Sequence, residues 1–122
     1  MSTTVAIPLA DAEGLFKGLA DPTRIRILNL LAAGELCVCD IVAILALPQS
    51  TVSRHLGYLM RSGLIEVSRA WKYSHYRLAE PTNELRRRLL ACVHSCFDDV
   101  ESLPVERALA ESRRAERERT PC

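Results

Sequence analysis

The stretch LPQSTVSRHLGYLMRSGLIEVSRAWKYSHYRL, residues 47–78, changes its hydrophobic period at Gly63. Before Gly63, apolar residues recur at the three- and four-residue spacing of an amphipathic helix. After Gly63, β-branched and aromatic residues flank a polar centre, which predicts two strands joined by a tight turn. A helix followed directly by a β-hairpin is typical of a winged helix-turn-helix.

Segments before this stretch predict three more helices. Residues 10–20 place their large apolar side chains on one side, which indicates a short amphipathic helix. Residues 21–34 open with Asp21 as N-cap and stop at Gly34, and a third helix runs from about 35 to 47. The order is therefore helix, helix, helix, turn, helix, hairpin.

The segment after the hairpin predicts one further helix and a charged tail. Pro81 opens this helix, which carries an apolar stripe. The stripe consists of Leu85, Leu89, Cys92, Val93 and Cys96. We expect a mainly α winged helix-turn-helix with five helices plus a two-stranded wing. Residues 1–103 are predicted to form the DNA-binding and dimerisation domain, and residues 104–122 a charged tail that is a frayed helix or disordered.

The composition is that of an ordinary globular domain with no overall basic excess. Its net charge is +1, so a nucleic-acid role requires basic residues gathered on one face. The N-terminus has no basic region before an apolar core, and no run of about 18 apolar residues exists, so we expect a cytoplasmic protein without a membrane span. In that reducing compartment, clustered cysteines indicate ligands or redox groups more than structural disulfides.

The predicted helix after Pro48 has one apolar and one polar side. On a helical wheel Leu56, Leu59 and Met60 fall on the same side as Val52, towards the core. Arg54 falls opposite. An arginine there can reach guanine O6 and N7 in a major groove, although a merely solvated polar face is the simpler alternative. The hairpin that follows favours the DNA-binding interpretation.

The other candidate contacts lie at the helix start and at the hairpin tip. Ser50 is expected to cap the helix, where it and Gln49 can meet a phosphate. Arg69 and Lys72 can contact the DNA backbone, and His55 is a packing or phosphate residue more than a base reader. The predicted DNA-binding residues are Gln49, Ser50, Thr51, Ser53, Arg54, His55, Arg69 and Lys72.

Four segments together resemble the ArsR/SmtB family of metal-responsive winged-helix repressors. They are LFKGLADPTRIRILNLL, ELCVCDI, LPQSTVSRHLGYLMRSGLI and YSHYRL, within about residues 12 to 98, and ELCVCD resembles the arsenic-sensing branch. The resemblance implies a homodimer joined by its first and last helices. It also implies a repressor that binds an operator when metal-free and leaves it when the inducer binds.

The cysteine motif departs from that branch at one position. The best-known form has a third cysteine where this chain has Val42, so Cys37 and Cys39 are one thiolate short of the three that As(III) prefers. On a regular helix these two residues point about 200° apart. We therefore expect that binding one soft ion to both distorts the first helical turn and changes DNA binding.

Cys92 and Cys96 are four residues apart and share one face of the predicted last helix. Three interpretations stay open: they complete the Cys37 and Cys39 site within or across the dimer, form a separate site, or simply pack. Cys122 lies in the polar tail, where no role is predicted for it.

The sequence thus predicts an arsenite- or antimonite-responsive repressor that binds operator DNA as a metal-free homodimer. Its metal ligands are Cys37, Cys39, Cys92 and Cys96, its inducer is As(III) or Sb(III), and no organic cofactor is expected. The alternatives are a response to another soft metal, Cd or Pb, or to thiol oxidation. No enzyme is predicted, since the chain lacks a glycine-rich phosphate loop and a nucleophile–base set.

Overall fold

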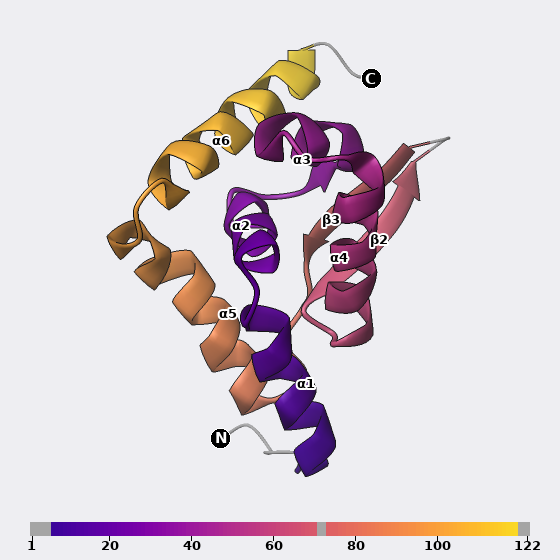
Figure 1. Cartoon of the computed structure of the whole chain (residues 1–122), viewed down its shortest axis with the longest axis vertical. Coiled ribbons are helices and arrows are strands. Elements are labelled where there is room, and N and C mark those ends of the chain that lie inside the picture. The colour runs from indigo at the N-terminus through magenta and orange to yellow at the C-terminus, as the bar shows by residue number, and fades with distance from the viewer. Residues whose placement is uncertain (1–5, 71–72, 120–122) are drawn as a thin grey trace.

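The structure is a computed structural model that describes residues 6–70 and 73–119, and its small sheet lies at one side of a mostly helical fold (Figure 1). No helix within those ranges is long and apolar enough to cross a membrane. The elements in chain order are α1 (Leu9–Leu19), α2 (Pro22–Leu31), β1 (Leu36–Cys37), α3 (Val38–Leu45), α4 (Gln49–Arg61), β2 (Ile65–Ala70), β3 (Tyr73–Leu78), α5 (Glu84–Cys96), the 3-10 helix η1 (Phe97–Asp99) and α6 (Leu103–Arg119).

Helix α2 lies at the centre of the fold and contributes much of the core (Figure 1). Its start is as predicted: the Asp21 carboxylate accepts hydrogen bonds from the backbone N–H groups of Thr23 at 2.8 Å and Arg24 at 3.1 Å. Its end comes earlier than predicted, because the helix stops at Leu31 and the chain then turns away at Gly34 with a φ of 129°, a conformation that favours glycine.

The predicted hairpin is confirmed, and a third strand extends it. Strands β2 and β3 pair antiparallel, with Val67 opposite Tyr76. The short strand β1 pairs with the other edge of β3, with Cys37 opposite His75, so the sheet order is β1-β3-β2. The expected two-stranded wing is therefore part of a three-stranded sheet. A two-residue strand is too short to leave a periodic pattern in the sequence.

Helix α4 buries most of the predicted apolar face. Val52, Leu56 and Leu59 are at most 1% exposed. The prediction for Met60 is wrong, because its side chain is 36% exposed. Met60 lies at the margin of the apolar face on the helical wheel, where the sheet and α2 no longer cover it.

The expectation for the tail differs from the structure, which has six α-helices in the described ranges where five were expected. Residues of the tail form α6, which packs on α2 and α3 although only Leu103 and Ala110 are buried in it. Ion pairs and arginine hydrogen bonds hold α6 in place. One example is the pair between Arg26 and Glu106, at 2.7 Å. The sequence lacks an apolar stripe here, so its pattern predicted no packing.

Helix α5 begins later than expected. Its N-cap is Asn83, whose side-chain oxygen accepts a hydrogen bond from the Arg86 N–H at 2.9 Å, and Pro81 lies outside the helix. The amide cap outweighs the tendency of proline to start a helix, because Asn83 satisfies a first-turn donor that Pro81 leaves unpaired.

Candidate metal centre and nucleic-acid interface

The junction between β1 and α3 brings the two cysteines of the CVC motif together. Cys37 ends β1 and is the N-cap of α3, with an extended φ of −78° and ψ of 156°. Cys39 lies in the first turn, and the two residues form a disulfide with their Cα atoms 5.4 Å apart. The expected angle of about 200° assumed a helix from residue 35 and is wrong, because Cys37 belongs to a strand. No helix has to be distorted.

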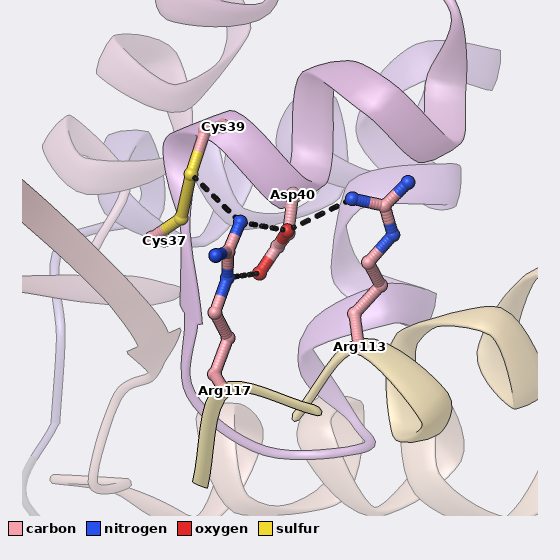
Figure 2. A network of polar contacts seen from close by, with 5 residues as sticks. All are labelled: Cys37, Cys39, Asp40, Arg113 and Arg117. Carbon is pink, nitrogen blue, oxygen red and sulfur yellow. Dashed lines mark hydrogen bonds and ion pairs between the residues drawn. A yellow bond between two sulfur atoms is a disulfide. The ribbon is translucent and has the colours of Figure 1, made fainter. Parts of the chain in front are cut away.

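A buried carboxylate lies directly beside the two sulfurs (Figure 2). Asp40 is 1% exposed, and its oxygens accept hydrogen bonds from Arg113 at 3.3 Å and from Arg117 at 3.1 and 3.2 Å. The Arg117 guanidinium also lies 3.8 Å from the Cys39 sulfur. Both arginines come from α6, so this helix lies against the thiol site, where Cys39 stays exposed.

The ligand atoms of Cys37, Cys39 and Asp40 all lie within 4.8 Å of one another. Once the disulfide is reduced, two thiolates and one carboxylate oxygen form a donor set for a soft or borderline ion. Sequence reasoning missed Asp40 because it searched for thiolates alone. The available signal was its position directly after Cys39, within the first turn of a helix.

Cys92 and Cys96 lie on α5, both exposed and both free. Loss of hydration and a hydrogen bond with Cys96 raise the pKa of the Cys92 thiol. Within one chain α5 lies across α2 from α3, so this pair does not join the Cys37 and Cys39 site (Figure 1). Cys122 lies outside the described residues.

The outward face of α4 carries the predicted base-reading residues. Ser53 and Arg54 are exposed, opposite the buried Val52. The prediction that Ser50 caps this helix is wrong: the helix begins at Gln49 after Pro48, and no side chain caps it. Proline fixes the backbone for a helix start, so the turn needs no serine cap. The first-turn N–H groups of α4 are consequently available to an anion.

His55 lies on the inner side of α4, 9% exposed. Its Nδ1 lies 3.3 Å from an Arg24 nitrogen and 3.9 Å from an Asp21 oxygen. The Arg24 guanidinium stacks 4.1 Å from the Tyr58 ring centre and donates to the carbonyl of Lys17 at 2.7 Å. These contacts tie α4 to the end of α1, so the geometry favours the packing role that the sequence left open for His55.

The wing presents an exposed Arg69 on β2, opposite Ser74 on β3. Lys72, the other residue predicted at the hairpin tip, lies outside the described residues. Thr51 is half-buried in the first turn of α4, and Gln49 and Ser50 are exposed. The predicted interface residues that are exposed thus lie in the first turns of α4, except Arg69, which lies on the wing.

Taken together, the helix pair α3 and α4 and the hairpin after it define a winged helix-turn-helix protein. A family model described as "Bacterial regulatory protein, arsR family" matches residues 21–67. The chain is 36% identical over 95 residues to the "Arsenical resistance operon repressor" of Bacillus subtilis (strain 168), covering 76% of this chain and 90% of that protein. The chain belongs to the arsR family of bacterial regulatory proteins.

Other relatives and solved structures agree. The "Arsenical resistance operon repressor" of Escherichia coli (strain K12) is 50% identical over 66 residues, which cover 53% of this chain and 56% of that protein. The match thus spans little more than half of that relative. A homodimeric winged helix-turn-helix domain from Mycobacterium bovis superposes with a TM-score of 0.63 at 34% identity, covering 75% of this chain and 82% of that one. The transcriptional repressor BigR from Xylella fastidiosa superposes with a TM-score of 0.64 at 29% identity. The match covers 77% of this chain and 90% of that one.

Proposed function

We propose that this chain is a transcriptional repressor that binds operator DNA as a homodimer and releases it when As(III) or Sb(III) binds Cys37 and Cys39. The observation that carries the proposal is the strand–helix junction, which brings the two sulfurs within bonding distance. Two relatives that carry the printed name arsenical resistance operon repressor support it. The proposed DNA partner places the site in the reducing cytoplasm, where the pair is present as thiols.

The chemistry of the reduced pair suits a trivalent arsenic or antimony acid. Arsenous acid exchanges two of its hydroxyl groups for the sulfurs of Cys37 and Cys39, and two molecules of water leave with the thiol protons. One hydroxyl stays on arsenic. The Asp40 carboxylate, whose oxygen lies within 4.8 Å of both sulfurs, is near enough to accept a hydrogen bond from that hydroxyl. Val42 offers no third thiolate, so the carboxylate takes its place as the polar partner.

The site is joined to both parts of the proposed DNA interface. Cys37 pairs with His75 in the wing strand β3, and Cys39 lies in α3, which packs against α4. An arsenic atom bonded to both sulfurs links the end of β1 to the first turn of α3, two segments that the free thiols leave unlinked. The change shifts the wing relative to α4, so ligand binding at one place biases the DNA-binding geometry.

We propose that α1 and α5 form the dimer interface. Leu9 is 86% exposed and Phe16 is 54% exposed, both on α1, and a dimer would cover such apolar side chains. The solved relative from Mycobacterium bovis is described as homodimeric. Sedimentation of the wild type at micromolar concentration should give a dimer, and Phe16→Glu should shift it towards monomer. A wild-type monomer would contradict this arrangement.

Thiol oxidation is a second candidate input, because Cys37 and Cys39 are bonded to each other in the structure. In this version an oxidant removes two electrons and two protons from the pair, and the reduced form alone binds the operator. A non-metal oxidant such as diamide would then release DNA, and a reductant would restore binding.

The proposal is tested by arsenite titration of reduced protein on a labelled operator, with a phosphine reductant because dithiols bind arsenite. We expect release from the wild type and retention by Cys37→Ser/Cys39→Ser. The response of Cys92→Ser/Cys96→Ser then reports whether the α5 thiols add ligands from the partner subunit. If both double variants leave DNA as the wild type does, the site assignment is wrong. Release by diamide alone would favour the oxidation candidate.

A further inference from the structure

The C-terminal helix α6 is attached differently along its two halves. Its buried residues, Leu103 and Ala110, both lie in the first half. In the second half, none of the residues that the structure describes is buried, and the attachment is polar. Arg114 donates to the carbonyl oxygens of Ala33 at 3.0 Å and Glu35 at 3.1 Å. Hydrogen bonds and ion pairs of half-exposed arginines are weak and exchangeable, so this half can detach locally.

The ion pairs of this half go to Asp40, through Arg113 and Arg117. Asp40 is 1% exposed. An ionised carboxylate in such a position needs a positive partner, since burial without one is strongly unfavourable. Arg113 and Arg117 supply that charge while α6 is docked. Detachment of α6 would expose the carboxylate to water and to the hydrogen-bond donor of a bound ligand.

The Arg117 guanidinium occupies the space that a ligand on the thiols would need. Two of its nitrogens donate hydrogen bonds to the Asp40 oxygens, at 3.1 and 3.2 Å. One of them also lies 3.8 Å from the Cys39 sulfur. Figure 2 shows it between the carboxylate and the sulfur pair. An arsenic atom bonded to both sulfurs, with its hydroxyl turned to Asp40, requires this same space and the same acceptor oxygens.

We propose that Arg117 is a positioning residue of the thiol site and that α6 is a latch released by the inducer. The inference rests on the proposed capture of As(III) by Cys37 and Cys39. Arsenous acid exchanges two hydroxyls for the two thiol sulfurs and releases two waters. The remaining As–OH donates its hydrogen bond to the Asp40 oxygen that Arg117 now contacts. Arg117 leaves, and the second half of α6, residues 111–119, detaches.

Linkage gives this latch a second measurable consequence. If arsenite binding weakens the docking of α6, then weakening the docking must strengthen arsenite binding by the same factor. Arg117→Gln should therefore bind arsenite several-fold more tightly than the wild type. Arg119→Gln is the matched control, because it removes the same charge from an exposed position on the same helix. A structural role alone would not produce tighter ligand binding.

The test is amide hydrogen exchange over residues 111–119 of the full-length, reduced protein, with and without saturating arsenite. We expect exchange in the wild type to accelerate at least about fivefold on arsenite binding, as for a local opening. We expect no acceleration in Cys37→Ser/Cys39→Ser. In Asp40→Asn the amides of residues 111–119 should exchange rapidly even without arsenite, because the substitution removes the carboxylate that holds α6.

The outcomes separate this inference from the proposed function when operator binding is measured on the same samples. Operator release with unchanged exchange at residues 111–119 overturns the latch and leaves the proposed function standing. Accelerated exchange with the operator still bound supports the latch and contradicts the proposed function. Equal arsenite affinity of Arg117→Gln and Arg119→Gln overturns the latch by a separate measurement.

Discussion

Arg117 and Asp40 lie 77 positions apart in the sequence, yet the Arg117 guanidinium donates hydrogen bonds to both carboxylate oxygens of Asp40, at 3.1 and 3.2 Å. The pair is unequal in its surroundings. The Asp40 side chain is 1% exposed and that of Arg117 is 38% exposed. Water can therefore solvate the arginine where it stands, whereas it reaches the carboxylate only when α6 detaches.

This inequality predicts unequal stability costs for the two sides of the pair. Asp40→Asn should lower the free energy of unfolding by about 1 kcal/mol, because the released arginines are solvated. Arg113→Gln/Arg117→Gln should cost more, about 3 kcal/mol, because a buried charge loses its partners. Urea unfolding of the reduced proteins measures both. Equal costs would mean that the Asp40 site is open to water.

The packing of α4 predicts a sharp contrast between two residues one turn apart. Leu56 is 1% exposed and Met60 is 36% exposed. Leu56→Ala should reduce the free energy of unfolding by about 2–5 kcal/mol, and Met60→Ala by less than about 1 kcal/mol. Urea unfolding of the two variants checks this order. A Met60→Ala cost as large as that of Leu56→Ala would contradict the orientation of α4.

The N-cap of α2 predicts a pH-dependent contribution from Asp21. Burial acts to raise the pKa of its carboxyl, but hydrogen bonds from the Arg24 and Thr23 backbone and the charges of His55 and Arg24 outweigh burial and lower it below 3.8. A lowered folded-state pKa stabilises the fold above the unfolded pKa of about 3.9, and this contribution disappears as the pH falls through the folded value.

Asp21→Ala should therefore cost about 1 kcal/mol of unfolding free energy near neutral pH, and the difference from wild type should shrink below about pH 4. Asp11→Ala, at an exposed carboxylate in the first turn of α1, serves as the control. Thermal unfolding across the pH range measures both. A difference that persists unchanged in acid would show that the charge of Asp21 contributes nothing.

The outward face of α4 predicts two kinds of DNA-binding defect. Arg54→Ala should weaken operator binding by about 1–3 kcal/mol and change the sequence preference, because arginine reads base edges. Arg69→Ala on the wing should weaken binding to specific and random DNA equally. It should also lower the salt dependence of that binding, as expected for the loss of a phosphate contact. Anisotropy titrations on both kinds of DNA separate the two. An equal loss of affinity for specific and random DNA in Arg54→Ala would contradict the proposal that Arg54 reads bases.

The features that the sequence predicted correctly are those with a local signal. Asp21 sits directly before the helix that it caps, and the change of hydrophobic period at Gly63 lies between α4 and β2. Short-range patterns of this kind are enough for the elements and their order. They placed Cys37 and Cys39 in one motif, although the strand that joins them was not foreseen.

The features that it missed depend on partners far along the chain. Helix α6 is fixed by contacts such as Arg26 with Glu106, 80 positions apart, and no periodicity records such a pair. Strand β1 exists because β3 offers it a free edge far along the chain, where Cys37 lies opposite His75, 38 positions later. Asp40 acquires its role from α6, so its place in the site followed only from the tertiary structure.

The central claim is that arsenite at Cys37 and Cys39 and operator DNA oppose each other on one protein. The most direct test measures the arsenite affinity of the reduced wild type twice, once free and once bound to operator. We expect arsenite to bind more weakly on DNA, by the factor by which arsenite weakens operator binding, typically about 5–150-fold for such coupling. Equal arsenite affinities in the two states would contradict it.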